Sequence, residues 1–302
     1  MDIELFEFNG EIWNIEKVLE ALSMHITPGD VLCIEVDTMR FGKLLPAVGR
    51  NQFLSNFFEL FKELTCPEGV LIIPSFSYSW GADSSEKIFD INNTPGKVGI
   101  FPEFMRIQPN VERTSDPMFS YLIFGNNAIN IAKIAGKNTF SSDGIYRYLH
   151  ENNAKLISFG LDGYDPTFIH YAEQYYHTNV QELDYRYIKE FNGEIINSFG
   201  DRFQDKQYCF SRILDRYEGW EFYDKNLILS LKKDKLLHEI TIGSGMVRIS
   251  DAESVFNASQ KGLSENKYFF IHKVISNIPK LMNTYSYINA IFINKFRFLC
   301  SN

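Results

Sequence analysis

Three side chains that could take part in proton transfer, Thr167, His170 and Glu173, follow one another at intervals of three residues. On a helix this spacing places them on roughly one face. A carboxylate there can orient the imidazole and stabilise its protonated form, and the imidazole can accept a proton from a substrate. His170 is therefore the candidate general base. The alternative is an ordinary His-x-x-Glu pair on a helix surface, and spacing alone does not exclude it.

The segment around these residues predicts a turn that joins a buried strand to a helix. The apolar run KLISFG ends at Gly160, Asp165 suits the N-cap of the next helix, and Pro166 suits its first position. In open α/β sheets ligands bind beyond the carboxyl ends of strands, where this turn would lie. The pattern is not HExxH and no third ligand stands out, so we expect no metal site.

Apolar periodicity predicts alternating helices and strands in the first half of the chain. Helices are expected at 14–26, 51–64 and 127–135, and strands at 31–36, 69–73, 121–124 and 155–160. This alternation predicts an α/β fold with a central mixed sheet flanked by helices. Residues 74–113 show no sustained period and are rich in Pro, Gly, Asn and aromatic residues, which is typical of an ordered functional loop.

The second half of the chain is more mixed, and we expect α+β structure there. Asn192-Gly193 predicts the turn of a β-hairpin. Ser250 and Glu253 match a capping box that would open a helix. Further elements are expected as helices near 207–217 and 222–235 and a strand at 238–243.

We expect one acyltransferase domain of two lobes, about 1–178 and 179–302. The aromatic tail NTYSYINAIFINKFRFLC could dock on the core or lie on a partner or membrane surface. Docking is favoured because the tail lacks one strongly charged face.

Composition limits the function classes. The net charge is −8 without a polybasic run, which argues against a nucleic-acid binder. The N-terminus lacks the apolar core of a signal peptide, and no apolar stretch is long enough for a membrane span. The 4 cysteines are widely spaced, as expected for free thiols in a reducing compartment. We therefore expect a cytoplasmic protein.

Six ordered segments resemble the aminoglycoside 3-N-acetyltransferase family, whose fold is unrelated to that of the commoner GNAT acetyltransferases. They are PGDVLCIEVDTMRFG, EGVLIIPSFSYSW, FDINNTPGKVG, FPEFMRIQPNVERTSDPMFS, GLDGYDPTFIHYAEQ and ITIGSGMVRISDAES. The resemblance implies transfer of an acetyl group from acetyl-CoA to an amine. It implies that His170 is the general base and that Glu173 orients it or helps to hold the amine, with Thr167 completing the motif. Because an ammonium group is no nucleophile, we expect this base to have a near-neutral pKa and to take a proton as the nitrogen attacks.

Two departures from the family pattern concern the expected coenzyme A and substrate sites. Glu35 stands where the family usually has the histidine of a His-Ser-Ser-Leu run, and the family's Arg-Ser-x-His-Pro also loses its histidine here. The retained hydroxyls and guanidinium make Thr38, Arg113 and Ser120 candidates for binding coenzyme A. The alternative for Arg113 and Ser120 is that they only fix a turn.

Candidate acceptor contacts are Asp90, whose carboxylate could face a substrate amine, and Tyr78 and Tyr175, which could stack on a sugar or a base. The alternatives are a turn-forming Asp near Asn and Pro, which is slightly favoured for Asp90, and aromatic packing for the tyrosines.

The leading hypothesis is a coenzyme-A-dependent N-acyltransferase for an amino sugar, nucleotide-linked and destined for a surface glycan. It rests on the lost histidines and on the loop 75–113, where five acidic residues against four basic ones make a poor trap for a polycation. The alternatives are an aminoglycoside 3-N-acetyltransferase and a non-catalytic interaction module on the same fold. A serine hydrolase is not expected because no Gly-x-Ser-x-Gly is present. A homodimer is left open.

Overall fold

The computed structural model describes residues 3–46, 48–134, 136–213 and 220–273, so the predicted docking of the C-terminal tail lies outside the described residues. The helical elements are α1 (Ile15–Leu22), η1 (Thr38–Arg40), α2 (Arg50–Thr65), α3 (Ile100–Arg106), α4 (Ala128–Ala132), α5 (Ile145–Glu151), α6 (Ile169–Asn179), α7 (Lys225–Lys233) and α8 (Ala252–Glu265). The strands are β1 (Glu4–Phe8), β2 (Glu11–Asn14), β3 (Val31–Val36), β4 (Val70–Pro74), β5 (Ile88–Asp90), β6 (Glu112–Arg113), β7 (Tyr121–Gly125), β8 (Lys155–Phe159), β9 (Arg186–Ile196), β10 (Arg202–Arg212), β11 (Trp220–Phe222), β12 (His238–Ile242), β13 (Gly245–Asp251) and β14 (Ile271–Lys273).

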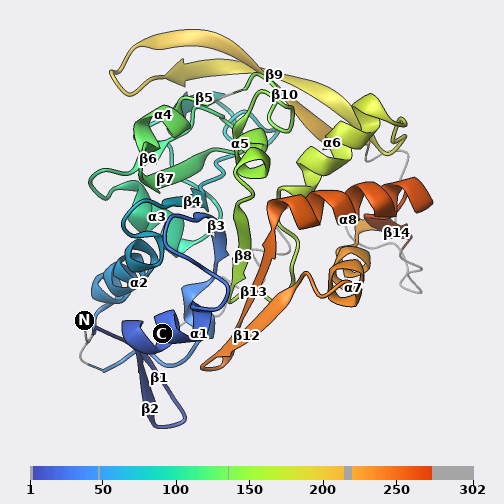
Figure 1. Cartoon of the computed structure of the whole chain (residues 1–302). Coiled ribbons are helices and arrows are strands. Elements are labelled where there is room, and N and C mark those ends of the chain that lie inside the picture. Colours follow the sequence, from blue (N-terminus) through green and yellow to red (C-terminus); the bar gives the residue numbers. More distant parts are fainter. Residues whose placement is uncertain (1–2, 47, 135, 214–219, 274–302) are drawn as a thin grey trace, which may run out of the picture.

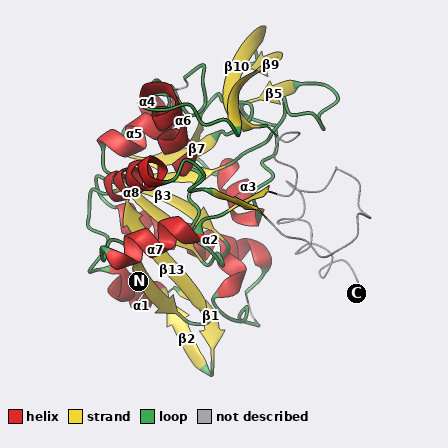
Figure 2. Ribbon diagram, turned by 90° about the vertical axis from the view of Figure 1, so that its right-hand side faces the viewer, coloured by secondary structure: helices red, strands yellow, loops and turns green. Residues whose placement is uncertain are grey.

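A seven-stranded mixed sheet in the order β12-β13-β8-β3-β4-β7-β6 forms the centre of the described structure. Strands β8, β3 and β4 are parallel, and the outer pairings are antiparallel. Helices cover both faces of this sheet (Figures 1 and 2). The predicted fold class, a mixed sheet flanked by helices with a more mixed second half, is confirmed.

The two faces of the sheet bury separate apolar clusters because successive residues of a strand point to opposite sides. In β3, Leu32 and Ile34 pack on the face covered by α1, α2 and α3, whereas Cys33 packs on the face covered by α4 to α8. Burial on both faces explains why the central strands read as continuous apolar runs in the sequence.

Most first-half elements match their predicted positions. Asn14 caps α1 as expected, with its Oδ1 accepting a hydrogen bond of 3.0 Å from Lys17 N, although the helix ends at Leu22. The region 74–113 is largely irregular and contains only the short elements β5, α3 and β6.

The predicted hairpin is present, but its turn lies elsewhere. Asn192 and Gly193 lie inside β9, and the chain reverses between β9 and β10, at 197–201. Gly193 is required by close packing: a Cβ there would lie 2.3 Å from the Lys87 carbonyl oxygen and 2.4 Å from the Trp80 indole nitrogen. The helix predicted at 207–217 is wrong for its described residues, since β10 runs to Arg212 and pairs with β9 along its whole length; residues 214–217 lie outside the described residues.

The capping box is also wrong. Ser250 belongs to β13, and α8 starts after Asp251. The backbone N–H of Glu253 donates instead to the side chain of Asn153, at 3.1 Å. The helix predicted near 222–235 and the strand predicted at 238–243, which precede this region, are confirmed as α7 and β12.

Candidate active site

The carboxyl ends of β8, β3 and β4 lie at one edge of the sheet because these strands are parallel. The turn to α6 follows β8, η1 follows β3, and the irregular loop follows β4. Three chain segments with candidate residues therefore meet at the edge where α/β proteins bind ligands.

Gly160 allows the turns after β8 and β3 to approach each other. Its φ is +82°, and a Cβ would lie 2.4 Å from the carbonyl oxygen of Asp37. The helix that follows begins at Ile169 with Phe168 as N-cap, so the predicted roles of Asp165 as N-cap and Pro166 as first residue are wrong.

His170 and Glu173, one helical turn apart on α6, form a close pair. Nδ1 of His170 lies 2.7 Å from Oε2 of Glu173. The Glu173 side chain is fully buried, whereas 23% of the His170 side chain remains accessible. Among the described residues, Nε2 of His170 has no hydrogen-bond partner. The imidazole is thus fixed through one nitrogen and free at the other.

Two neighbouring residues that the sequence analysis did not single out, Tyr185 and Arg186, complete this cluster. The Tyr185 hydroxyl donates to Oε1 of Glu173 at 2.9 Å, and Arg186 Nε donates to the same oxygen at 3.1 Å. Arg186 also reaches Oε2 of Glu173 at 2.8 Å and the Phe210 carbonyl at 3.1 Å. No local motif marks these residues, because strand pairing and not helical spacing brings them to α6.

The contacts define the proton positions in the pair. Nη2 of Arg186 and Nδ1 of His170 are 3.0 Å apart and both point to Oε2 of Glu173. The ionised carboxylate of Glu173 only accepts hydrogen bonds, so its 2.7 Å contact with Nδ1 of His170 requires that nitrogen to carry the proton and to donate. The lone pair of the imidazole then lies on Nε2.

Electrostatics keep the imidazole neutral and the carboxylate charged. Burial and the Arg186 charge lower the pKa of His170 to about 4, despite the opposing effect of Glu173. Burial would raise the pKa of Glu173, but Arg186 and His170 hold it at about 2. The near-neutral pKa expected for the base is therefore too high, because the sequence did not show the arginine beside it.

Thr167 does not join His170 in this cluster. Its backbone N–H and its hydroxyl both donate to Oε1 of Glu35, each at 2.9 Å. Burial raises the pKa of Glu35, against these two hydrogen bonds, which lower it. Glu35 thus ties the end of β3 to the start of α6, and its other carboxylate oxygen has no partner among the described residues.

Thr38 lies at the start of η1, directly after β3. Only 3% of the residue is exposed, and its Oγ1 has no hydrogen-bond partner within the described part of the chain. Asp37 caps this turn through a 3.2 Å hydrogen bond from Met39 N. A buried hydroxyl without a protein partner is suited to a ligand.

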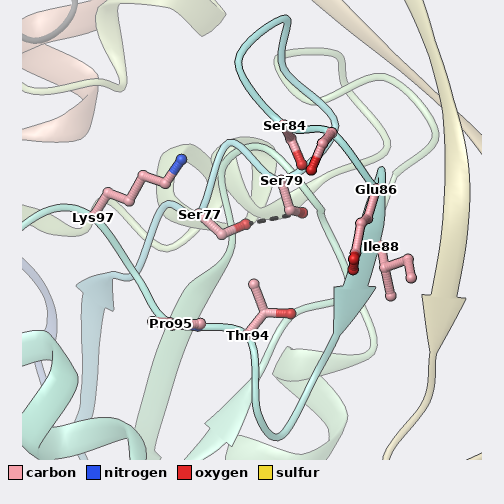
Figure 3. Close-up of a pocket in the computed structure, with 9 residues that line it drawn as sticks. Ser77, Ser79, Ser84, Glu86, Ile88, Thr94, Pro95 and Lys97 are labelled. Carbon is pink, nitrogen blue, oxygen red and sulfur yellow. Dashed lines mark hydrogen bonds between the residues drawn. The ribbon is translucent and has the colours of Figure 1, made fainter.

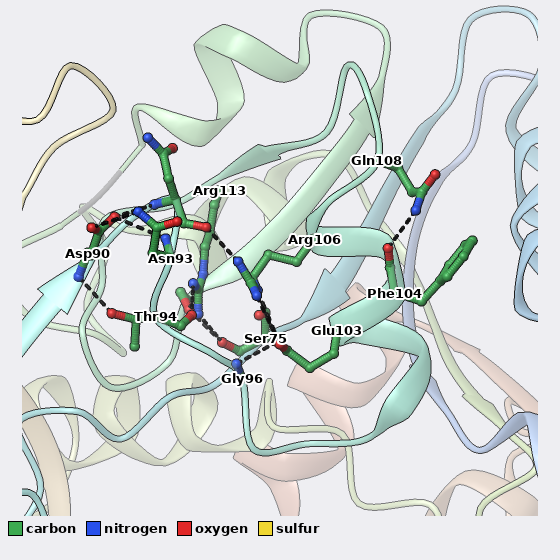
Figure 4. Close-up of polar contacts among 12 residues, drawn as sticks. Ser75, Asp90, Asn93, Thr94, Gly96, Glu103, Phe104, Arg106, Gln108 and Arg113 are labelled. Carbon is green, nitrogen blue, oxygen red and sulfur yellow. Dashed lines mark hydrogen bonds and ion pairs between the residues drawn. The ribbon is translucent and has the colours of Figure 1, made fainter. Parts of the chain in front are cut away.

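Arg113 is bonded to the protein itself (Figure 4), and so is Ser120. Arg113 donates to the Ser75 carbonyl at 2.9 Å, to the Thr94 carbonyl and to the Ser120 hydroxyl at 3.1 Å. The Ser120 hydroxyl donates to the Ser75 carbonyl at 2.7 Å. Arg113 is only 8% exposed, and this geometry favours the alternative that both residues fix the loop.

The Asp90 carboxylate is likewise hydrogen-bonded within its own turn. Its Oδ1 accepts from the backbone N–H groups of Asn92 and Asn93, and its Oδ2 accepts from the Asn93 side chain at 2.9 Å. Partial burial opposes these bonds, yet they and Arg202 lower the pKa of Asp90. The turn-forming role weighed from the sequence fits this geometry.

The two tyrosines lie in aromatic packing. Tyr78 makes an edge contact with Phe119 at 5.3 Å between ring centroids. Tyr175 packs against Phe256 of α8 at 5.1 Å and is 42% exposed. It follows His170 by five residues, which places it about 140° around the helix, away from the imidazole.

A hollow of about 350 Å³ lies in the loop that follows β4 (Figure 3). Hydroxyl side chains dominate its lining, and Lys97 lies at one side of it. The lining residues are Ser77, Ser79, Ser84, Ser85, Glu86, Ile88, Thr94, Pro95 and Lys97. Neither His170 nor Glu173 is among them, so this hollow is separate from the proton-transfer cluster.

A family model for aminoglycoside 3-N-acetyltransferase matches residues 46–264. The chain belongs to this family. The family confirms the enzyme class predicted from the sequence, an N-acetyltransferase. No curated protein sequence matches this chain significantly.

Solved structures resemble this acetyltransferase in fold. AAC-VIa bound to sisomicin has a TM-score of 0.68 and 18% identity, over 84% of this chain and 98% of that chain. AAC-IIIb in a binary complex with CoASH has a TM-score of 0.66 and 15% identity, over 84% and 97%. The YokD protein from Bacillus subtilis has a TM-score of 0.66 and 16% identity, over 84% and 94%. The predicted acyl donor, acetyl-CoA, agrees with the family and with the CoASH of AAC-IIIb.

Two further observations concern the described residues of this acetyltransferase. None of their helices combines the length and the hydrophobicity needed to cross a bilayer. They also contain no group of three or more His, Cys, Asp or Glu side chains placed to bind a metal ion.

Proposed function

We propose that this acetyltransferase transfers an acetyl group from acetyl-CoA to the amine of an amino sugar, with His170 as general base. The observation that carries the proposal is the His170–Glu173 pair, fixed by Tyr185 and Arg186, in a chain of this family. The pair presents an accessible, neutral imidazole nitrogen at the edge of the sheet where ligands bind.

In the reaction, the amine nitrogen of the acceptor attacks the thioester carbonyl and forms a C–N bond. Nε2 of His170 takes the proton that the nitrogen loses, and Glu173 stabilises the imidazolium. When the C–S bond breaks, His170 returns this proton to the leaving sulfur. The low pKa of His170 makes its imidazolium a strong acid for that second step.

The low pKa also defines which form of the acceptor reacts. An imidazole with a pKa of about 4 cannot deprotonate an alkylammonium group to a useful extent before attack. The acceptor must therefore bind as the free amine, and the acidic limb of the kcat/KM profile should follow the pKa of the acceptor amine.

Thr38 is our candidate contact for the donor. Its hydroxyl is buried without a protein partner at the carboxyl end of β3, so it can bond the pantetheine chain or the developing oxyanion. We do not assign Arg113 to the donor site, because its guanidinium is already hydrogen-bonded to Ser120 and to the Ser75 carbonyl.

For the acceptor, we favour a nucleotide-linked amino sugar over an aminoglycoside. Acidic residues only slightly outnumber basic ones in the loop 75–113, whereas a polycation calls for several carboxylates. A cytoplasmic location and a role in surface glycan synthesis are parts of the same proposal.

The test is a coenzyme A release assay with acetyl-CoA against nucleotide-linked amino sugars and aminoglycosides. His170→Asn should lower kcat/KM by about 10²-fold or more, the usual scale for a general base, with little change in Tm. The matched control is His238→Asn, because His238 is an exposed residue at the edge strand β12. Near-normal turnover of folded His170→Asn would refute the assignment.

A further inference from the structure

Arg212 lies opposite Arg186 at the end of the β9–β10 hairpin away from its turn. This end of the hairpin lies beside α6 (Figure 1). Residues directly opposite each other in an antiparallel pair project to the same face, with Cβ atoms about 5 Å apart. The Arg186 side chain contacts His170 and Glu173, so the Arg212 side chain extends next to the same pair.

The two arginines differ in their bonding. Arg186 makes a contact with each of its three guanidinium nitrogens, on both oxygens of Glu173 and on the Phe210 carbonyl. Arg212 has no hydrogen-bond or ion-pair partner among the described residues, although it is partly buried. Burial and then the charge of Arg186 lower the pKa of Arg212, against Glu173 and Glu221, which raise it.

The charge of Arg212 is not neutralised by a direct ion pair within the described part of the chain. Arg186 forms the ion pair with Glu173, whereas Glu173 and Glu221 act on Arg212 only at a distance, without an ion pair to it among the described residues. Like charges opposite each other on paired strands destabilise a sheet unless another group compensates them. An anion bound at Arg212 would compensate this charge beside the imidazole.

We propose that Arg212 binds a phosphate of the acceptor, which makes an anionic, nucleotide-linked amino sugar the substrate class of this site. The inference rests on the proposed acetyl transfer. A guanidinium pairs with phosphate through parallel hydrogen bonds. The phosphates of coenzyme A are separated from the thioester by the pantetheine arm, so a phosphate close to His170 belongs to the acceptor. An aminoglycoside would instead bring ammonium groups towards a guanidinium that has no ion-pair partner among the described residues.

The test uses inorganic pyrophosphate as the probe and does not require turnover. Its binding to the full chain is measured by calorimetry, and the His170 ring is followed by NMR, with and without saturating coenzyme A. We expect pyrophosphate to bind and to raise the pKa of His170. Arg212→Met should weaken binding roughly 10- to 100-fold, and Arg212→Lys should retain part of it.

The control is Arg202→Gln, which removes an arginine from the same strand at an exposed ion pair with Glu194. It should leave pyrophosphate binding unchanged. Three results would overturn the inference: no binding by the wild-type chain at tens of millimolar probe, equal binding by folded Arg212→Met, or displacement of pyrophosphate by coenzyme A. Displacement would assign the anion site to the donor. The proposed acetyl transfer is judged separately, by the His170→Asn assay.

Discussion

Replacing Arg186 by Gln removes the cation whose Nη2 lies 3.0 Å from His170 Nδ1. With an effective dielectric constant of about 20, two unit charges at this distance repel by about 5 to 6 kcal/mol, or about 4 pKa units. This is an upper limit, because each charge is delocalised over a group whose centre lies farther away than these two atoms. Burial and Arg212, which also lower the pKa of His170, remain in the variant. A neighbouring charge usually shifts a pKa by about 1 to 3 units. We therefore expect the pKa of His170 to rise from about 4 to between about 5 and 7.

The assay follows the ring Cε1–H resonance of His170 between pH 3.5 and 8.5, assigned by its absence in His170→Asn. In the wild-type enzyme this resonance should not titrate between pH 5.5 and 8. In Arg186→Gln it should titrate within that range, and the activity at pH 6 relative to pH 8 should fall, because the base becomes protonated. Arg186→Lys, which keeps the charge, should hold the pKa low.

The variant removes one partner of a buried ion pair, so a stability loss of about 3 to 5 kcal/mol is expected. The titration is therefore measured well below the Tm of each variant. A wild-type His170 that titrates above pH 6, or an unchanged pKa in folded Arg186→Gln, would refute the argument that Arg186 keeps the base neutral.

Three further predictions follow from the same contacts. Glu173→Gln should lower both activity and Tm, because it leaves the buried Arg186 without its carboxylate; an unchanged Tm would show that the ion pair does not stabilise the fold. Arg113→Lys should lower Tm, because lysine cannot make the several hydrogen bonds of the guanidinium, while KM for acetyl-CoA should change less than about threefold. A larger change in KM would show that Arg113 binds the acyl donor. Gly193→Ala should destabilise the enzyme by about 1 to 3 kcal/mol in chemical denaturation, because its Cβ would overlap the Lys87 carbonyl; wild-type stability would show that β5 and β9 can separate there.

The local part of the fold was predictable because it depends on apolar spacing and capping chemistry. The run 31–36 is apolar throughout, as a strand buried on both faces must be, and it forms β3. Asn14 caps α1 because its side chain reaches an N–H group three residues away. Both signals lie within a few residues of the structure that they specify.

The second half shows where such signals fail. Asn192-Gly193 usually forms a tight turn, but here the glycine lies in β9 because the Trp80 indole and the Lys87 carbonyl approach it too closely for a side chain. Residues 207–212 form strand in spite of the predicted helix, since pairing with β9 satisfies their backbone groups. Contacts with distant residues decided both cases.

The sequence by itself determined the mixed α/β fold, the acetyltransferase family and the helical neighbourhood of His170 and Glu173. These follow from residue order and from spacing along one helix. Only the tertiary structure decided what surrounds the pair. In the folded chain Thr167 donates a hydrogen bond to Glu35, and Arg186 lies against the imidazole of His170. The Arg212 side chain has no hydrogen-bond or ion-pair partner among the described residues. The physical reason is that charge and burial act through space, so residues far apart in sequence determine the pKa of His170.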